Sequence, residues 1–376
     1  MCKKIIMSLL ALCCSMMLSG TAQMLSISSQ SAVVIEADSG EVLFEKDAHT
    51  ARPMASTTKL MTALVAAETL PLDKDITVSA TAVAVEGSAL GLRAGDSISL
   101  ADLLTGLLLA SGNDAANVTA QAVARDLPSF ANKMNAKAAM LGMKDSRFVT
   151  PSGLDAEGHA ASAYDMALLG RAVLQNDFLS KVCATKSTKI LFGNPKREVW
   201  VSNHNRLLKM RADCIGMKTG FTKRAGKCLV SAAERDGVTV VAATLNGGDY
   251  WNDHIALHEL AFSKLQRVTL PNVTLADVPV SGGVADTLQL SLPAIPQVTL
   301  NKEVAQDIQT TLLLPSFVVA PVAAGEKIGQ VVYTLGEREL ARIPITAKTD
   351  IAAIPPLSFW EQLIENFTAL LRWLVQ

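Results

Sequence analysis

Apolar and polar positions repeat with different periods in successive parts of the chain. Short β-rich runs at residues 31–35 and 41–44 flank Asp38-Ser39-Gly40, a pattern typical of a β-hairpin. Helical spacing follows in five segments, at residues 60–70, 100–110, 115–125, 129–141 and 159–174. The strand-like runs that come next, at residues 214–219, 228–233 and 238–245, precede a closing helix over 251–266. This order predicts one α+β domain whose first and last strands share a sheet.

The pattern changes near Val268. From there to Thr349 only short strand-like runs occur, at residues 273–278, 288–292, 309–314, 327–334 and 340–345. Glycine-containing turns separate these runs, and none of them contains a motif that carries chemistry. We therefore expect a first domain over residues 23–268 and a small all-β domain, a sandwich, over residues 269–350.

The last segment, residues 351–376, contains an amphipathic helix. Its apolar residues fall at i, i+3, i+4 and i+7 spacing, at Trp360, Leu363, Ile364, Phe367, Leu370, Leu371 and Leu374. Glu361, Glu365 and Arg372 fall on the other side, which argues against a membrane span. Because Trp and Phe suit a membrane interface, we expect this helix to contact a membrane surface. A helix docked on the β domain is the alternative, and the shortage of Lys and Arg favours it.

The N-terminus has the pattern of an export signal. Two lysines, at positions 3 and 4, precede the apolar run Ile5 to Leu18 and the small residues Ser19-Gly20-Thr21-Ala22. We expect residues 1–22 to be a signal peptide that is cleaved after Ala22, and the protein to act outside the cytoplasmic membrane. A retained anchor is the alternative. A lipoprotein signal at Cys13 or Cys14 is disfavoured because Leu12, not a small residue, ends the preceding stretch.

Composition adds few constraints. The 376 residues carry a formal net charge of −1 and contain no long basic run, so we expect no nucleic-acid partner. Beyond the signal three cysteines remain, Cys183, Cys214 and Cys228, so at most one disulfide can form. They lack the paired spacing of a zinc site, and buried thiols are the favoured interpretation.

The segment Met54-Ala55-Ser56-Thr57-Thr58-Lys59 places a serine and a lysine three residues apart where an apolar helix begins. On a helix these positions share a face, so Lys59 can reach the hydroxyl of Ser56. A serine is a poor nucleophile unless a nearby group takes its proton, and a lysine does so only if its pKa is lowered. The alternative is that Ser56 caps the helix.

Two further motifs favour catalysis by Ser56. Ser111-Gly112-Asn113 stands where an apolar helix stops, and Lys218-Thr219-Gly220 stands where a strand pattern gives way to a turn. Each is weak alone. S-x-x-K, S-x-N and K-T-G in this order, behind an export signal, are the three elements of penicillin-binding proteins and serine β-lactamases.

Acyl transfer requires an activated nucleophile, an oxyanion site and a grip on the substrate. Ser56 would attack a carbonyl and Lys59 would take its proton. Ser111 would relay a proton to the leaving amine, and Asn113 would hold the substrate amide or Lys59. The substrate's terminal carboxylate would meet a group of residues near the third motif, namely Lys218, Thr219 and Thr222. Lys218 would also help to keep Lys59 neutral.

Backbone groups complete this predicted site. Gly220 would let a bound peptide approach the strand edge. The N–H groups of Ser56 and Phe221 are the natural oxyanion donors.

Nearly the whole chain resembles a low-molecular-mass penicillin-binding protein, a D-alanyl-D-alanine carboxypeptidase of the peptidase S11 type. Beside the three motifs, the resemblance rests on the following segments: Ala32-Val33-Val34-Ile35, Pro53-Met54-Ala55, Ser111-Gly112-Asn113-Asp114-Ala115-Ala116, Ser152-Gly153-Leu154-Asp155 with His159 and Asp165-Met166-Ala167, Lys218-Thr219-Gly220-Phe221-Thr222 with Ala225-Gly226, and Ala324-Gly325-Glu326-Lys327-Ile328-Gly329. Ser152 departs from the His or Asn expected at its position.

The resemblance implies an α+β fold with an antiparallel sheet, helices on both of its faces and a helical subdomain. The β domain and the amphipathic tail resemble that family's C-terminal stalk and membrane anchor. The family removes the terminal D-alanine of peptidoglycan pentapeptides on the outer face of the bacterial cytoplasmic membrane. It does so through an acyl-enzyme that penicillin mimics, without metal or cofactor.

Several alternatives remain open. A β-lactamase of the class A pattern would need a glutamate in E-x-x-x-N, but Ala161 stands four residues after Glu157. A D,D-transpeptidase or endopeptidase shares the same residues, and a non-catalytic penicillin sensor shares the fold.

His254 and His258, four residues apart, have metal-ligand spacing but no clear third ligand, so a structural role is favoured. His159 and His204 are also expected to be structural.

Overall fold

The structure is a computed structural model that describes residues 25–374. The predicted signal peptide, residues 1–22, lies outside the described residues. Within the described chain two compact units separate, one of residues 25–235 and 239–263 and one of residues 236–238 and 264–374.

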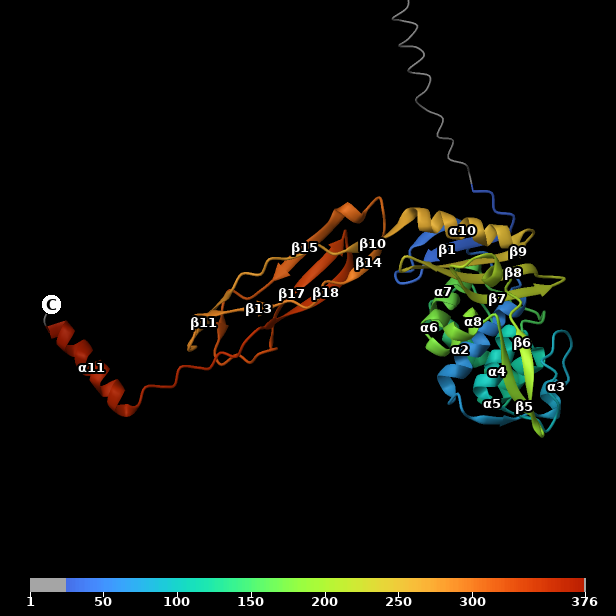
Figure 1. Ribbon diagram of the computed structural model, residues 1–376, viewed down its shortest axis with the longest axis horizontal. Coiled ribbons are helices and arrows are strands. Elements are labelled where there is room, and N and C mark those ends of the chain that lie inside the picture. Colours follow the sequence, from blue (N-terminus) through green and yellow to red (C-terminus); the bar gives the residue numbers. More distant parts are fainter. Residues whose placement is uncertain (1–24, 375–376) are drawn as a thin grey trace, which may run out of the picture. The chain divides into compact units, whose positions relative to one another are not determined.

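A five-stranded antiparallel sheet organises the first unit, in the order β2-β1-β9-β8-β7 (Figure 1). Its strands are β1 (Ser31–Glu36), β2 (Val42–Lys46), β7 (Cys214–Thr222), β8 (Gly226–Arg235) and β9 (Val238–Gly247). Val33 of the first strand faces Ala243 of the last, which confirms that the two ends of the domain share a sheet. Strand β7 lies at one edge, so one row of its backbone groups has no strand partner within this sheet.

Helices cover both faces of this sheet, as Figure 1 shows for α7 and α10. Gly170 of α7 (Ala163–Leu174) packs so closely on Val230 and Val241 that an added Cβ would lie 2.9 and 2.8 Å from their methyl groups. Ser231 follows Val230 and points to the other face, where it bonds His254 of α10 (Tyr250–Lys264). Successive side chains of β8 point to opposite faces of the sheet. Each residue of this strand therefore packs against either α7 or α10, according to its face.

The helical subdomain surrounds one buried helix, α2 (Lys59–Thr69), in which every residue from 59 to 66 is buried. Five helices pack against it: α4 (Leu100–Leu109), α5 (Asn113–Val123), α6 (Leu127–Met140), α8 (Asp177–Ala184) and the sheet-covering helix α7. Because α2 has no polar face, it can exist only where other helices enclose it.

The remaining elements of this unit flank the helices. A second sheet has the order β3-β4-β5-β6, with β3 (Asp75–Thr77), β4 (Ser97–Ser99), β5 (Ser187–Gly193) and β6 (Lys196–Ser202), and the short helices α3 (Ala80–Val83) and α9 (Leu207–Met210) complete the unit. Three of these strands, β3 to β5, were missed in the sequence because they are short or lie among charged residues.

Three predicted helix starts were wrong. Helix α6 begins at Leu127, two residues earlier than expected. Helix α7 begins after Ser162, whose hydroxyl accepts a hydrogen bond from the backbone N–H of Asp165, rather than at His159. Helix α5 begins at Asn113, two residues earlier than expected, so Asn113 stands in its first turn.

The second unit is all-β apart from a 3-10 turn (Ala305–Asp307) and the C-terminal helix. Its strands are β10 (Leu265–Thr269), β11 (Val278–Ser281), β12 (Thr287–Leu288), β13 (Leu290–Ser291), β14 (Gln297–Asn301), β15 (Ile308–Leu313), β16 (Val318–Val319), β17 (Lys327–Leu335) and β18 (Arg338–Ala347). They form sheets of order β10-β14, β12-β11-β16 and β13-β18-β17-β15. The strand predicted over 273–278 was wrong: Val273 and Leu275 pack on the small core from irregular backbone.

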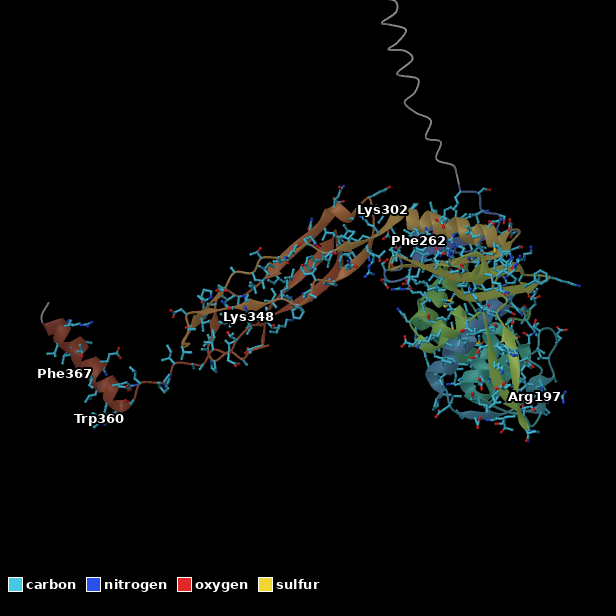
Figure 2. All side chains as sticks on the ribbon, in the orientation of Figure 1. Arg197, Phe262, Lys302, Lys348, Trp360 and Phe367 are labelled. Atoms are coloured by element: carbon cyan, nitrogen blue, oxygen red, sulfur yellow. The ribbon has the colours of Figure 1, made fainter. Side chains whose placement is uncertain are left out.

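The C-terminal helix α11 (Phe359–Leu374) has its apolar residues exposed, among them Trp360 (69%) and Phe367 (62%), which are labelled in Figure 2. Among the described residues, no helix is both long and apolar enough to span a membrane.

Candidate active site

Ser56 lies in a 3-10 turn, η1 (Ala55–Thr58), that leads directly into α2. Met54 and Thr58 occupy the cap positions of η1 and α2, and neither helix start has a side-chain cap hydrogen bond. The alternative role of Ser56 as a helix cap is therefore wrong. Ala55 before it has φ of 49°, a left-handed conformation that is uncommon outside glycine. The turn therefore carries backbone strain next to the Ser56 hydroxyl.

Lys59 is fully buried, and three oxygens surround its Nζ. They are the hydroxyl of Ser56 at 2.9 Å, the amide oxygen of Asn113 at 2.8 Å and the carbonyl oxygen of Ser152 at 2.6 Å. The latter two can only accept hydrogen bonds. In a neutral amine its two N–H groups therefore go to Asn113 and Ser152, and its lone pair faces Ser56.

The electrostatics around Lys59 favour that neutral form. Burial lowers the pKa of Lys59 well below its ordinary value, and the charge of Lys218 lowers it further. The Asp114 carboxylate acts in the opposite direction and raises the pKa. The two effects that lower the pKa prevail, so Lys59 has the electrostatic setting of a base.

Ser111 lies in the sharp connection between α4 and α5, and Asn113 is the first residue of α5. Ser111 has φ of 60° and is 5% exposed, and no other side chain of the described residues bonds its hydroxyl. The amide of Asn113 is oriented by its Nδ2, which donates to the carbonyl of Glu86 at 2.7 Å. Its oxygen must therefore face Lys59. The S-x-N motif therefore contacts the S-x-x-K motif through the side-chain amide of Asn113, which accepts a hydrogen bond from Lys59.

Lys218 lies within β7, not at its end as the sequence had suggested. A bulge precedes it, where Gly216 and Met217 have φ of 107° and 93° and the pairing with β8 shifts register. Its side chain is 1% exposed, and its Nζ donates to the carbonyl of Thr219 at 3.1 Å. Burial lowers the pKa of Lys218 to about 8, and the nearby Cys183 thiol opposes this shift.

Gly220 brings β7 against the turn of Ser56. A Cβ at this position would lie 2.9 Å from the backbone nitrogen of Ser56 and 3.0 Å from that of Thr57. Only glycine lets the edge strand come so close without displacing the backbone. The next residue, Phe221, is 66% exposed.

The Thr222 hydroxyl is engaged within the protein. It accepts a hydrogen bond from the backbone N–H of Ala225 at 2.9 Å and donates to the carboxylate of Asp155 at 3.2 Å. Thr222 therefore joins the end of β7 to the loop that follows Ser152.

That loop, residues 149–159, was not predicted to contribute to the site. Its contribution is the backbone carbonyl of Ser152, which no side-chain pattern reveals. Gly153 makes it possible, since it has φ of 85° and a Cβ there would lie 1.9 Å from the carbonyl oxygen of Ala55. A glycine after an irregular run was the one signal in the sequence that could have pointed to this close approach.

His159 holds the same loop in place. Its Nδ1 accepts from the backbone N–H of Val149 at 2.9 Å, so its Nε2 carries the proton and donates to the hydroxyl of Thr58 at 3.0 Å. Burial lowers the pKa of His159 to about 4. The residue is a neutral structural link, as expected.

The His254 and His258 pair is structural too. Both rings bond the hydroxyl of Ser231, and His254 also bonds that of Thr244. Among the residues that the structure describes, no cluster of three His, Cys, Asp or Glu side chains is placed to hold a metal ion. Cys183, Cys214 and Cys228 are free and buried.

Comparisons with known proteins agree with this arrangement. A family model described as D-alanyl-D-alanine carboxypeptidase, Peptidase_S11, matches residues 18–249, and one described as penicillin-binding protein 5, C-terminal domain, matches residues 266–353. The D-alanyl-D-alanine carboxypeptidase DacF of Bacillus subtilis is 30% identical over 90% of both chains.

Solved structures extend the similarity to three dimensions. The D-alanyl-D-alanine carboxypeptidase DacD from Francisella tularensis is 26% identical, with a TM-score of 0.62 over 88% of this chain and 95% of its own. The D-alanyl-D-alanine carboxypeptidase from Mycobacterium tuberculosis is 35% identical, with a TM-score of 0.61 over 65% of this chain and 95% of its own.

Proposed function

The chain belongs to the D-alanyl-D-alanine carboxypeptidase family, peptidase S11, and on this premise we propose that Ser56 is the nucleophile with which it removes the terminal D-alanine of peptidoglycan pentapeptides. The observation that carries the assignment is the contact of Lys59 with Ser56, because the acceptor-only oxygens around Lys59 leave its lone pair to the serine. The protein is a serine-type carboxypeptidase of cell-wall metabolism.

Acylation begins with the proton of Ser56. Lys59 takes this proton while the serine oxygen attacks the carbonyl carbon of the penultimate D-alanine. The backbone N–H groups of Ser56 and Phe221 receive the negative charge on the carbonyl oxygen. Lys218 and Thr219 hold the terminal carboxylate, and the close approach of Gly220 lets the peptide lie along the free edge of β7.

Collapse of the tetrahedral intermediate breaks the peptide bond. The leaving amine of D-alanine gains a proton through Ser111, whose hydroxyl is free for this relay, while Asn113 keeps Lys59 in place. A water molecule then attacks the acyl-enzyme, with Lys59 again as base, and regenerates Ser56. A β-lactam enters the same first step, and its ring nitrogen remains attached as part of the acyl group.

A fluorescent penicillin and a peptide that ends in D-Ala-D-Ala test this proposal together. We expect stable labelling of Ser56 and release of D-alanine, with both lost in Ser56→Ala. Labelling that survives in Ser56→Ala would refute the assignment. Rapid turnover of penicillin would indicate a β-lactamase, transfer of the acyl group to an added amine a transpeptidase, and labelling without D-alanine release a sensor.

We assign α11 to a membrane surface. Its apolar side chains are exposed along the helix, including Trp360, Phe367 and Trp373 (73%). Trp and Phe favour the interfacial region of a bilayer, while Glu361 and Arg372 would remain in water. We further propose that residues 1–22 direct export and that the catalytic domain (23–268) and the β domain (269–350) lie outside the cytoplasmic membrane.

A further inference from the structure

Asp114, which follows the S-x-N motif, is a buried carboxylate without an ion-pair partner. It is 2% exposed, and no Lys or Arg of the described residues lies within salt-bridge distance of it. Burial of an unpaired charge is unfavourable unless hydrogen bonds replace water. The presence of a buried, unpaired carboxylate next to Asn113 therefore needs a physical explanation.

Backbone N–H groups of one loop supply those hydrogen bonds. The Oδ1 of Asp114 accepts from Leu90 at 2.8 Å, and its Oδ2 accepts from Gly91 at 2.9 Å and Leu92 at 3.1 Å. The Oδ1 also accepts from Ala115 at 2.8 Å. Three consecutive amides of a loop thus converge on one carboxylate.

The same loop is bound at its other end by Asn113. The backbone N–H of Asn113 donates to the carbonyl of Ser88, and its Nδ2 donates to that of Glu86, both at 2.7 Å. The dipeptide Asn113-Asp114 therefore holds residues 86–92 from both sides. Gly112 allows this approach, because a Cβ there would lie 2.7 Å from the Oδ1 of Asp114 and 2.9 Å from the nitrogen of Leu90.

The bond to Glu86 decides which way the Asn113 amide faces. Because a carbonyl only accepts, the Nδ2 must point to Glu86, and the Oδ1 must point to Lys59 at 2.8 Å. If the loop moved away, the amide could rotate and present N–H to Lys59. Two donors would then face each other, and the lone pair of Lys59 would no longer be directed at Ser56.

We propose that Asp114 is a positioning residue of this enzyme, which fixes the loop 86–92 so that Glu86 orients Asn113 and Asn113 orients Lys59. The inference rests on the proposed function of Ser56 and Lys59. Asp114 touches neither substrate nor nucleophile and acts only through this chain of hydrogen bonds.

A comparison of Asp114→Asn with the unmodified full chain tests the proposal. An Asn amide would turn its NH2 toward two of the loop N–H groups, which breaks the clamp and also removes a negative charge. We expect acylation of Ser56 by a fluorescent penicillin to slow at least tenfold. We also expect the acid limb of its pH profile to move to lower pH, because the carboxylate raises the pKa of Lys59.

Asp253→Asn is a matched control. Asp253 is also buried (4% exposed) and accepts backbone N–H groups, those of Ser28 and Ser29 at 2.8 Å, but it belongs to α10. The Asp253→Asn substitution should lower the melting temperature of the protein. The acid limb of the pH profile and the acylation rate should not change. A folded Asp114→Asn enzyme with the normal rate and normal acid limb would overturn the proposal.

If Asp114→Asn does not fold, Gly87→Ala tests whether the loop 86–92 orients Asn113. Gly87 is on the exposed part of the loop with φ of 85°, and a Cβ there would lie 2.9 Å from the Nδ2 of Asn113. Acylation should slow at least fivefold with an unchanged acid limb, since the charge of Asp114 remains. A normal rate would show that the loop does not orient Asn113.

The side-chain NH2 signals of Asn113 in ¹⁵N-labelled protein separate the two proposals. In the unmodified chain Nδ2 donates to the Glu86 carbonyl, so these protons should exchange slowly with solvent. Loss of that protection in Asp114→Asn would support the clamp even if penicillin failed to label Ser56. Failure of labelling in the unmodified chain would refute only the proposed function, whereas unchanged Asn113 signals in Asp114→Asn would refute the clamp.

Discussion

The Nζ of Lys59 lies 2.9 Å from the Oγ of Ser56, three residues earlier in the chain, and both of its other contacts are oxygens that only accept hydrogen bonds. A protonated lysine would donate to all three. A neutral one has a single lone pair, and the serine is the only one of the three partners with a proton to give. The activation of Ser56 therefore depends on the protonation state of Lys59 as well as on the distance between Nζ and Oγ.

Replacing Lys59 by arginine tests this dependence. Arginine is always positively charged in a protein and cannot become neutral, so it cannot take the serine proton. We expect penicillin acylation to fall by about 10²–10⁴-fold, the usual contribution of a general base. Lys137→Arg, at an ion pair with Glu68 on the surface, is the control. If the Lys59→Arg enzyme folds and retains a tenth of the rate, another group is the base.

Gly220→Ala probes the fit between β7 and the turn of Ser56. The added Cβ would lie 2.9 Å from the Ser56 nitrogen, so strand or turn must shift, and the oxyanion donors move with them. We expect acylation to slow by about 10²–10³-fold, the value of one such donor. Gly248→Ala, whose Cβ would have only ordinary contacts at 3.5 and 3.7 Å, should leave the rate unchanged. A normal rate in Gly220→Ala would contradict the proposed oxyanion site.

The pH profile of kcat/KM should have two limbs. Lys59 must be neutral, so activity falls as pH decreases through its lowered pKa. Lys218 must be charged to hold a carboxylate, so activity falls again as pH rises above about 8, the pKa to which burial lowers it. Lys218→Arg should move the alkaline limb to higher pH, because arginine stays charged. If the alkaline limb stays at the same pH in Lys218→Arg, the titration of a group other than Lys218 causes that limb.

The stability of the fold should decrease in mild acid through His159. Its folded pKa of about 4 lies below the ordinary value of 6.5, so the neutral form is stabilised. This contribution is complete above pH 6.5 and is lost as pH falls from there toward 4. Between pH 7 and pH 5 the free energy of unfolding should drop by about 2 kcal/mol from this residue. Urea unfolding at both values should show a smaller drop in His159→Gln; an equal drop would assign the loss elsewhere.

Binding of α11 to membranes should be driven by apolar contact rather than by charge. Its residues Glu361, Glu365 and Arg372 offer no excess of positive charge to anionic lipids. We expect the full chain to sediment with phosphatidylcholine vesicles, equally in low and high salt, and Phe367→Glu to remain in the supernatant. Glu365→Gln is the control on the polar side. Binding that appears only with anionic lipid, or that survives Phe367→Glu, would contradict an apolar interfacial helix.

The sequence was most informative where chemistry needs particular side chains. The three motifs pointed to Ser56, Lys59, Asn113 and Lys218, because no other residue types supply those groups in that order. The order of the predicted elements, with strands early, helices in the middle and strands late, also placed the first and last strands of the domain in one sheet. These inferences depend on periodicity and on residue type, both of which are visible in a single sequence.

What the sequence did not reveal depends on the backbone. Carbonyl oxygens of Glu86 and Ser152 orient Asn113 and Lys59, yet every residue has a carbonyl group. The register shift before Lys218 and the left-handed turn at Ala55 arise from tertiary packing, which overrides local preference. The strand predicted at 273–278 failed for the same reason: Val273 and Leu275 bury apolar surface without pairing in a ladder.

The contact of Lys59 with the Ser152 carbonyl has a consequence for how this site can change. A main-chain oxygen cannot be removed by substitution, so a scan of alanine variants would pass over one of the three ligands of the base. The side chain at position 152 can therefore differ among relatives, while the course of the main chain through Gly153 cannot. Loss of this contact would have to come from substitutions that move the loop, because no exchange of residue 152 alone deletes the oxygen.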